Sequence, residues 1–232
     1  MKLAIMQPYF LPYIGYFQLI NAVDQFVIYD NIQYTKKGWI NRNRFLRNGA
    51  DYLFTISLQK DSDFLNICDR KIDNNFAKVK LLNKLRHAYG KAPFFGATYP
   101  IIEEIIQNED DNLFTYILNS VISICRFLKI DTTIITSSTI SIDHSLTGQK
   151  KVVALCQKLE ADVYINAIGG QELYNKESFR KIGCDLQFIK SDQISYNQFS
   201  QAFVPNLSIL DLMMFNKEED IRNMLNQYSI IQ

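Results

Sequence analysis

The spacing of apolar residues at the start of the chain predicts a strand, a stiff turn and a helix. Leu3 to Met6 form a short apolar run of the kind that becomes a buried strand. Pro8 and Pro12 follow it, and proline is excluded from central strands and from helix interiors. The apolar positions from residue 14 to residue 20 then suit a helix that begins near Gly15.

This turn has the position of a ligand-binding loop. In an open parallel sheet, ligands lie outside the carboxyl ends of the strands, and the N-terminus of a helix favours an anion. Gln7, Tyr9 and Tyr16 are the side chains that the turn offers to a ligand. The other interpretation is a plain connection whose aromatic side chains pack into the core, and the pattern leaves both open.

The middle of the chain predicts a hairpin followed by helices. Strands are expected over residues 24–30, 43–47, 51–58 and 68–72. Asn48-Gly49 reads as the turn of the hairpin. Helices are expected over residues 76–89, 100–107 and 112–128. Gly90 suits the end of the first helix, and Asp110 or Asp111 suits the N-cap of the third.

The last third alternates strands and helices, which favours an α/β fold with a parallel sheet. Strands are expected over residues 132–137, 163–167 and 185–189, and helices over 145–159, 176–182, 208–215 and 218–227. We therefore expect one domain over residues 1–232. Its α/β core would comprise residues 1–60 and 130–232, and residues 61–129 would be a mainly helical insertion.

Composition narrows the class of protein without naming a partner. The chain has 232 residues, of which 47% are hydrophobic, which is enough for one domain with a real core. Its formal net charge of +1 gives no argument for nucleic acid or an anionic membrane. The four cysteines form no CxxC pair, so we expect buried thiols in a reducing cytoplasm. With no secretory signal and no apolar run of about 18–20 residues, a cytoplasmic location without a membrane is expected.

A polar and aromatic segment after the second strand offers groups that suit a nucleotide. Lys37 and Arg42 match phosphate oxygens, Asn41 and Asn43 can bind an amide or a sugar hydroxyl, and Trp39 can stack on a ring. The alternative interpretation of this segment is a solvated surface turn.

A third candidate lies at the end of the strand over 163–167. Asn166 is followed by Gly169 and Gly170, and two glycines allow a positive φ and a close approach of the backbone to a phosphate. The signal is weak, because the chain contains neither a GxGxxG fingerprint nor a phosphate-binding P-loop.

Acid–base and metal chemistry have few candidates. His87 falls inside a predicted helix and reads as structural, whereas His144 follows a strand end and is better placed for function. No serine or cysteine can be tied to His144 as a nucleophile by spacing. The sequence has no HxxxH, HExxH or Cys/His cluster, so no metal site is predicted.

Five segments carry motifs of a known family. They are residues 4–17 (AIMQPYFLPYIGYF), 37–44 (KGWINRNR), 89–95 (YGKAPFF), 147–188 and 203–212 (FVPNLSILDL). In this order they span nearly the whole chain, and together they resemble the WbqC-like family of bacterial proteins. The resemblance implies a transferase in the biosynthesis of O-antigen, capsule or another surface polysaccharide. It also implies that a glycyl-like aminoacyl or an acyl group is joined to the nitrogen of a nucleotide-linked amino sugar, forming an amide bond.

The first loop is similar, more distantly, to the strand–loop–helix of nucleotidyltransferases and pantothenate synthetases. That likeness implies a Rossmann-like fold, with a three-layer parallel sheet, a β-hairpin insertion and a helical region. In that group a His-x-Gly-His motif binds the phosphates of ATP. Gly15 stands at the glycine here, but Tyr13 and Tyr16 replace the two histidines, which argues against the same ATP chemistry.

The expected roles follow from the family resemblance and the residue types. Asp30 or His144 would act as the general base, and Arg42 and Lys37 would contact the diphosphate. Trp39 would stack, and the remaining contacts to sugar or acyl donor would come from Gln7, Asn41, Asn43 and Asn166.

The expected partners are a nucleotide-linked amino sugar and an acyl or amino-acid donor, and the sequence names no cofactor. An ATP-dependent ligase or nucleotidyltransferase and a non-catalytic sugar-nucleotide binding protein are the alternatives. A charged tRNA as donor is disfavoured by the near-neutral charge.

Overall fold

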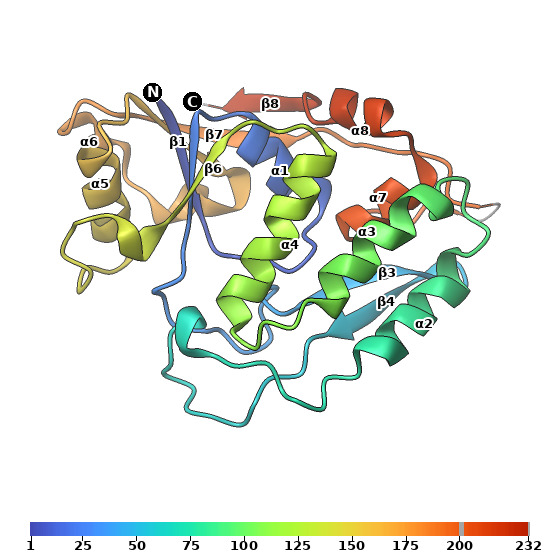
Figure 1. The fold of residues 1–232 in the computed structure, drawn as a ribbon. Helices are drawn as coiled ribbons and strands as arrows, with labels where there is room; N and C mark the ends of the chain where they lie inside the picture. The colour runs from blue at the N-terminus through green and yellow to red at the C-terminus, as the bar shows by residue number, and fades with distance from the viewer. Residues whose placement is uncertain (200–201, 232) are drawn as a thin grey trace.

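A six-stranded sheet forms the centre of the fold in the computed structural model, which describes residues 1–199 and 202–231 (Figure 1). Its strands are β1 (Lys2–Met6), β2 (Gln25–Ile28), β5 (Thr133–Thr136), β6 (Val163–Ala167), β7 (Asp185–Ser191) and β8 (Tyr228–Ile231). They lie in the order β5-β2-β1-β6-β7-β8, and only the β7–β8 pair is antiparallel. Counted along the chain, this is the order 3-2-1-4-5-6 of the doubly wound nucleotide-binding fold, as expected.

Successive side chains of each strand point to opposite faces of this sheet. Apolar residues lie on both faces, so helices cover both. Ala4 and Phe26 belong to the core cluster under α1 (Ile14–Asn21) and α4 (Leu113–Phe127). Leu3 and Val27 belong to the second cluster, under α5 (Gly148–Lys158) and α6 (Lys176–Arg180). Figure 1 shows α5 and α6 to the left of the strands and α1 and α4 to the right.

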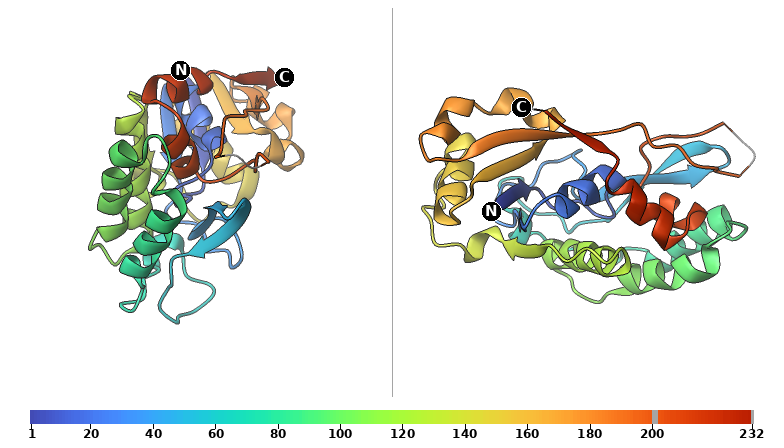
Figure 2. Two further views of the ribbon diagram at one scale, coloured as in Figure 1. Left: turned by 90° about the vertical axis from the view of Figure 1, so that its right-hand side faces the viewer. Right: turned by 90° about the horizontal axis from the view of Figure 1, so that it is seen from above.

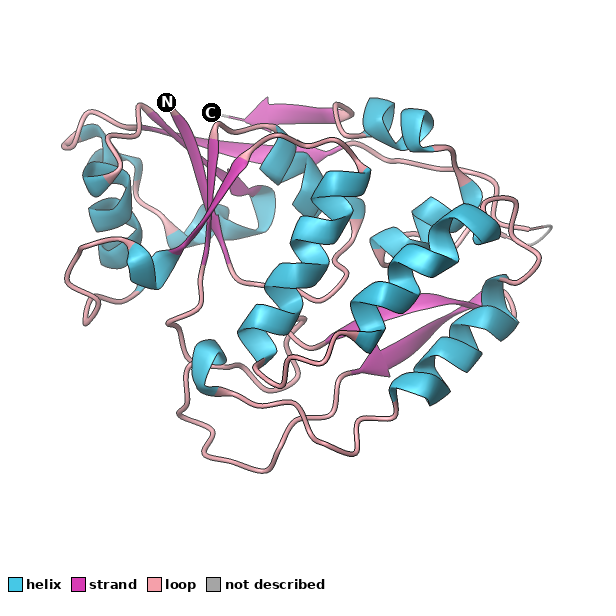
Figure 3. Ribbon diagram, viewed as in Figure 1, coloured by secondary structure: helices cyan, strands magenta, loops and turns pink. Residues whose placement is uncertain are grey.

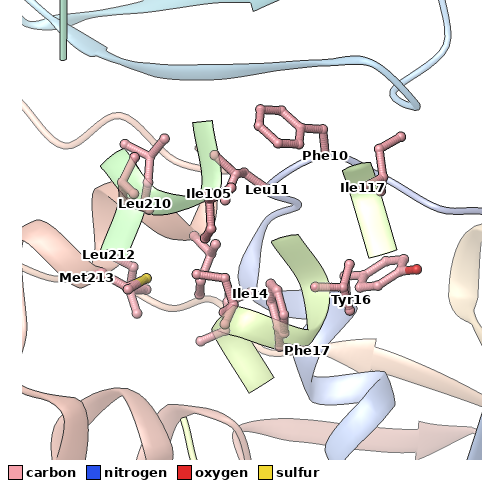
Figure 4. Packing of buried hydrophobic residues seen from close by; sticks show 14 of the residues in the cluster. Phe10, Leu11, Ile14, Tyr16, Phe17, Ile105, Ile117, Leu210, Leu212 and Met213 are labelled. Atoms are coloured by element: carbon pink, nitrogen blue, oxygen red, sulfur yellow. The ribbon is translucent and has the colours of Figure 1, made fainter. Parts of the chain in front are cut away.

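The larger cluster ties the N-terminal loop to the C-terminal helices. Figure 4 shows Phe10 and Leu11 of that loop beside Ile117 of α4 and Leu210 of α7 (Ile209–Phe215). All four side chains are fully buried. Complete burial of such a side chain contributes about 1.5–3 kcal/mol, so this packing holds the loop firmly in place.

Residues 29–132 form the insertion between β2 and β5. It contains the hairpin of β3 (Arg42–Arg47) and β4 (Ala50–Thr55), then α2 (Lys78–Tyr89), α3 (Phe95–Gln107) and α4. Asn48 and Gly49 both have positive φ, at 52° and 76°, as a tight hairpin turn requires. In Figure 3 the hairpin stands apart from the central sheet, beside α2 and α3. The chain ends with α7, α8 (Glu218–Met224) and β8.

Four predictions of local structure are wrong. Residues 68–72 form part of a short 3₁₀ helix (Ile67–Asp69) and two isolated bridges, because Ile72 pairs with Leu58 and Lys71 with Asn112, and neither partner lies in a strand. Helix α3 begins at Phe95 and contains Pro100. Its first turn is held by tertiary contacts, since Thr98 Oγ1 donates to the carbonyl of Met213 at 2.7 Å.

The other two errors lie at chain positions with competing local signals. Asn112, rather than Asp110 or Asp111, caps α4, and its side-chain oxygen accepts from the amide of Thr115 at 3.1 Å. The last helix ends at Met224, and the sequence analysis misses β8. An edge strand of four residues directly after a helical pattern carries too little periodicity to be separated from that helix.

Candidate functional site

The strand order brings two of the predicted loops to one edge of the sheet. From β1 the chain continues to β2 and β5 on one side, and later to β6 and β7 on the other, so the order reverses between β1 and β6. Ligands of such sheets bind at this reversal, outside the carboxyl ends of the strands. Gln7 follows β1 and Asn166 stands at the end of β6, so the structure brings these two predicted residues to the same edge.

The proline-containing loop after β1 is fixed by two other parts of the chain. The amide of Phe10 donates to the carbonyl of Ile40 at 2.9 Å, and Asn43 Nδ2 donates to the carbonyl of Leu11 at 2.7 Å. From the other side, Ser208 Oγ donates to the same Leu11 carbonyl at 2.7 Å. Leu11 has a φ of 44°, a strained value that these bonds hold in place.

Within this loop, Gln7 and Tyr9 are the predicted ligand contacts that solvent reaches. Tyr16 is buried and donates from Oη to the carbonyl of Gln7 at 3.0 Å, and burial holds the pKa of Tyr16 well above its usual value. Tyr9 is only partly buried, and its Oη donates to Gln7 Oε1 at 3.4 Å. Tyr16 therefore supports the loop, whereas Gln7 and Tyr9 present atoms at the edge of the sheet.

A tyrosine ring occupies the start of α1. Tyr13 is the N-cap residue and is 40% exposed. Its ring lies on Gly15, where an added Cβ would come within 2.4 Å of Tyr13 Cε2. Glycine at this position therefore lets the ring pack over the first turn of the helix.

The hairpin segment gathers positive charge around the tryptophan. The guanidinium groups of Arg42 and Arg44 lie 5.6 and 5.2 Å from the centre of the Trp39 ring, which is a cation–π distance. Arg44 pairs with Asp51 at 3.0 Å, while Arg42 Nη2 donates to the carbonyl of Lys37. The Nε atoms of both arginines are buried and have no acceptor within the described residues. Because Trp39 is 42% exposed, this cluster presents an accessible ring with two guanidinium groups beside it.

Sequence reasoning selected Arg42 and missed Arg44. Arg42 and Arg44 are two residues apart on β3, so their side chains lie on the same face of the hairpin. This spacing could have indicated Arg44. Lys37 is exposed and contributes its backbone carbonyl to the cluster.

Asn41 and Asn43, by contrast, are built into the scaffold. Asn41 Nδ2 donates to the carbonyl of Ile56 at 2.8 Å, and its Oδ1 accepts from Tyr34 Oη at 2.9 Å. Asn43 donates to the loop carbonyls and accepts from the amide of Arg44 at 2.8 Å. In this conformation both amides hold the hairpin and the proline loop together.

Asp30 lies at the carboxyl end of β2 with one oxygen unused. It is 5% exposed, and its Oδ1 accepts from Ser137 Oγ at 2.7 Å and from the amide of Ser138 at 2.9 Å. No hydrogen bond reaches Oδ2 from the described residues. A carboxylate with one fixed and one unused oxygen has the form that a general base requires.

His144 has both ring nitrogens engaged. Nε2 lies 2.9 Å from the carbonyl of Ile140, which can only accept, so Nε2 carries the proton. Nδ1 therefore accepts from Asn31 Nδ2 at 2.8 Å. With no unused lone pair on the ring, His144 is a poorer base in this arrangement than Asp30.

A buried lysine that the sequence analysis missed fixes this arrangement. Lys151 of α5 is 4% exposed, and its Nζ donates to the backbone carbonyl of Asn31 at 3.0 Å and to Asn31 Oδ1 at 3.1 Å. Burial lowers the pKa of Lys151, and the nearby Asp30 carboxylate acts in the opposite direction. Its position four residues before Leu155 on the apolar face of the helix is the signal that could have found it.

The glycines after β6 behave differently from expectation. An added Cβ on Gly170 would lie 2.6 Å from Asn166 Nδ2, so the expected close approach is present, but to a side chain of the protein itself. Neither Gly169 nor Gly170 has a positive φ, so the left-handed conformation that glycine allows is not used there. Both lie in a 3₁₀ helix (Ile168–Leu173), whose hydrogen bonding keeps φ negative. Asn166 is 5% exposed, and its Oδ1 accepts from the amide of Ala167.

The described residues contain neither a candidate metal site nor a candidate membrane-spanning helix. Among residues 1–199 and 202–231, no group of three or more His, Cys, Asp and Glu side chains is arranged to hold a metal ion. In the same residues, no helix has the length and apolar character needed to cross a membrane. Cys125, Cys156 and Cys184 are buried free thiols, as expected, and Cys68 is partly buried.

Comparison with known proteins supports a family assignment over nearly the full length. Residues 7–223 match the model of the WbqC-like protein family. A protein of Mycobacterium tuberculosis named "Uncharacterized protein Rv1507c" is 29% identical over 217 residues, which cover 91% of this chain and 92% of the relative. No solved structure matches the chain.

Proposed function

Because the chain belongs to the WbqC-like protein family, we propose that it is an enzyme that forms an amide on a nucleotide-linked amino sugar. It would transfer a glycyl-like aminoacyl or an acyl group during the biosynthesis of a surface polysaccharide such as O-antigen or capsule. The observation that carries this proposal is Asp30, a buried carboxylate with an unused oxygen at the carboxyl end of β2.

Amide formation on an amino sugar needs a base, because the sugar nitrogen is protonated at neutral pH. Asp30 Oδ2 would take a proton from the ammonium group, and the freed nitrogen would attack the carbonyl carbon of the acyl donor. The tetrahedral intermediate would then pass a second nitrogen proton to the donor's leaving group as that group departs, and the amide would form. Ser137 and the amide of Ser138 would hold Asp30 in orientation throughout.

The cluster of Trp39, Arg42 and Arg44 would bind the diphosphate of the nucleotide. Guanidinium groups form charge-assisted, often bidentate hydrogen bonds to phosphate oxygens. The two guanidinium groups beside the exposed Trp39 ring support this role, and Lys37 adds a nearby exposed cation. Gln7, Tyr9 and Asn166 would contact the sugar or the donor, while Asn41 and Asn43 would hold the hairpin against the loop.

Calorimetry with a panel of nucleotide-linked amino sugars tests the binding part of the proposal. We expect at least one to bind, and Arg42→Ala to weaken it about tenfold or more, since a charged hydrogen bond contributes about 1.5–3 kcal/mol. Arg47→Ala is the matched control, because Arg47 lies on the same strand, is exposed and has its guanidinium over Tyr52. Unchanged affinity in the Arg42 variant would remove the phosphate role.

Two further outcomes would favour the alternative functions. Release of pyrophosphate that depends on ATP, magnesium and the sugar would identify a ligase or nucleotidyltransferase. Tight binding without product over a range of acyl donors, including thioesters and charged tRNA, would identify a non-catalytic binding protein.

A further inference from the structure

A cavity opens beside the start of α1, away from Asp30. Its volume is about 660 Å³, and it is bounded by Tyr13 and Ile14, by residues 190–194 at the carboxyl end of β7 and by residues 205–207 before α7. Cavities that hold small molecules measure roughly 300–1,000 Å³. The cavity therefore has the size of a ligand site, and it lies at the carboxyl end of β7, two strands along the sheet from β1.

One wall of the cavity is aromatic and rigid. The exposed ring of Tyr13 is seated on Gly15, and Tyr196 meets Phe203 edge to face with ring centres 5.1 Å apart. Tyr196 is anchored because its Oη donates to the buried carboxylate of Asp211 at 2.6 Å. Preformed aromatic faces of this kind favour a planar ring as the ligand.

Residues next to the cavity-lining positions 196 and 205–207 are also held in place. Gln198 donates to the same Asp211 carboxylate at 2.7 Å, and the amide of Ser208 donates to the carbonyl of Arg44 at 2.9 Å. Figure 2 shows α7, in red, close to the light-blue hairpin of β3 and β4. The cavity thus adjoins the strand that carries the arginine cluster.

The polar rim suits a sugar with neighbouring hydroxyl groups. Asp192 directly follows β7, its side chain is exposed, and no cation pairs with it in the described part of the chain. Its one side-chain bond is from Ser229 Oγ at 3.3 Å. A carboxylate is an acceptor with two oxygens, so it can accept from both hydroxyls of a vicinal diol. Lys190 also lines the cavity and supplies a cation.

We infer that this cavity binds the nucleoside part of the nucleotide-linked sugar, with the base against Tyr13 and the ribose diol donating to Asp192. The inference rests on the proposed function, because it assigns the part of the substrate that the arginine cluster and Asp30 leave without a site. The cavity would therefore bind a ribonucleotide more tightly than its 2′-deoxy counterpart.

Calorimetry with UDP, CDP, ADP and GDP, and with the 2′-deoxy form of each, tests the inference. We expect one ribonucleoside diphosphate to bind. Tyr13→Ala would weaken it about tenfold, within the range for the loss of one base–aromatic stack. Asp192→Asn would weaken the ribonucleotide about tenfold or more, and the 2′-deoxy form much less. Asp185→Asn, at the amino end of the same strand, is the control and would leave both affinities unchanged.

The outcomes separate this inference from the proposed function. A nucleoside diphosphate or nucleotide sugar that binds wild type, Tyr13→Ala and Asp192→Asn equally would overturn the cavity assignment and leave the proposed function standing. Equal loss of both ribose forms in Asp192→Asn would overturn the role of the diol. If no nucleotide and no nucleotide sugar binds wild type, the proposed function falls, and this inference falls with it.

Discussion

Asn43 provides a direct test of how the hairpin holds the proline loop. Its side chain donates to the carbonyl of Phe10 at 3.2 Å and to that of Leu11 at 2.7 Å, and it accepts from the amide of Arg44 at 2.8 Å. Asn43→Ala removes all three bonds from a residue that is 6% exposed. Leu11 keeps the bond from Ser208, but the Phe10 carbonyl loses its side-chain donor.

The expected loss of stability follows from these bonds. A net hydrogen bond contributes about 0.5–1.5 kcal/mol, and a buried group left unsatisfied costs about 1–3 kcal/mol. We therefore expect Asn43→Ala to lower the free energy of unfolding by about 2–4 kcal/mol. For a domain of this size that corresponds to a fall in Tm of about 4–16 °C.

Urea unfolding followed by far-UV circular dichroism measures this change without any ligand. Asn83→Ala is the control, since Asn83 is exposed on α2 and alanine is the better helix former, so its stability should stay the same or rise slightly. A variant at Asn43 within about 0.5 kcal/mol of wild type would refute the reasoning. Asn43 would then be free to serve as a ligand contact, as the sequence alone suggested.

Two other regions give predictions of the same kind. Gly170→Ala should lower the free energy of unfolding by about 1–3 kcal/mol, because the new Cβ meets Asn166 Nδ2 at 2.6 Å. The new Cβ of Gly169→Ala meets nothing within 4 Å, so this control should keep the wild-type free energy of unfolding. Urea unfolding of both variants measures the difference. Asp30→Asn should lower the pKa of Lys151 further, because the Asp30 carboxylate raises it. NMR of ¹³C-lysine-labelled protein measures this pKa, and an unchanged titration of Lys151 in the variant would contradict the prediction. Since burial lowers the pKa of Lys151 in the folded state, the unfolded chain binds more protons below the usual lysine pKa, so this group adds stability as pH rises towards that value. Lys151→Met should remove that gain as pH rises towards the usual lysine pKa, and an equal dependence of the free energy of unfolding on pH in the two proteins would count against it.

The parts of the fold that sequence could predict are those with a strong local pattern. The apolar run before Gln7 and the Asn48-Gly49 turn specified β1 and the hairpin because period and turn chemistry agree there. Strand β8 escaped detection, since an antiparallel edge strand depends on its partner β7 for nearly all of its hydrogen bonds. The early start of α3 depends in the same way on contacts with α7.

The same distinction between local pattern and tertiary contact applies to the candidate site. Residue type and strand ends predicted Asp30 and Gln7 as candidates at one edge of the sheet, because loops at the carboxyl ends of parallel strands meet there, and residue type alone predicted Arg42 on the hairpin. The spacing of residues could not reveal that Lys151 reaches Asn31 from 120 positions away, or that both nitrogens of His144 are engaged. The cavity bounded by Tyr13, residues 190–194 and residues 205–207 joins segments from opposite ends of the chain, which only the folded structure brings together.

The most direct test of the account is mass spectrometry of the reaction with a nucleotide-linked amino sugar that binds in the calorimetric screen. Wild type, supplied with the matching acyl or aminoacyl donor, should convert the sugar to a product heavier by the acyl group with loss of one hydrogen. Asp30→Asn should bind the sugar with wild-type affinity and form no more than about one hundredth of the product, as the loss of a general base predicts. Product formed by Asp30→Asn at the wild-type rate would contradict the assignment of Asp30 as the base on which the proposed reaction depends.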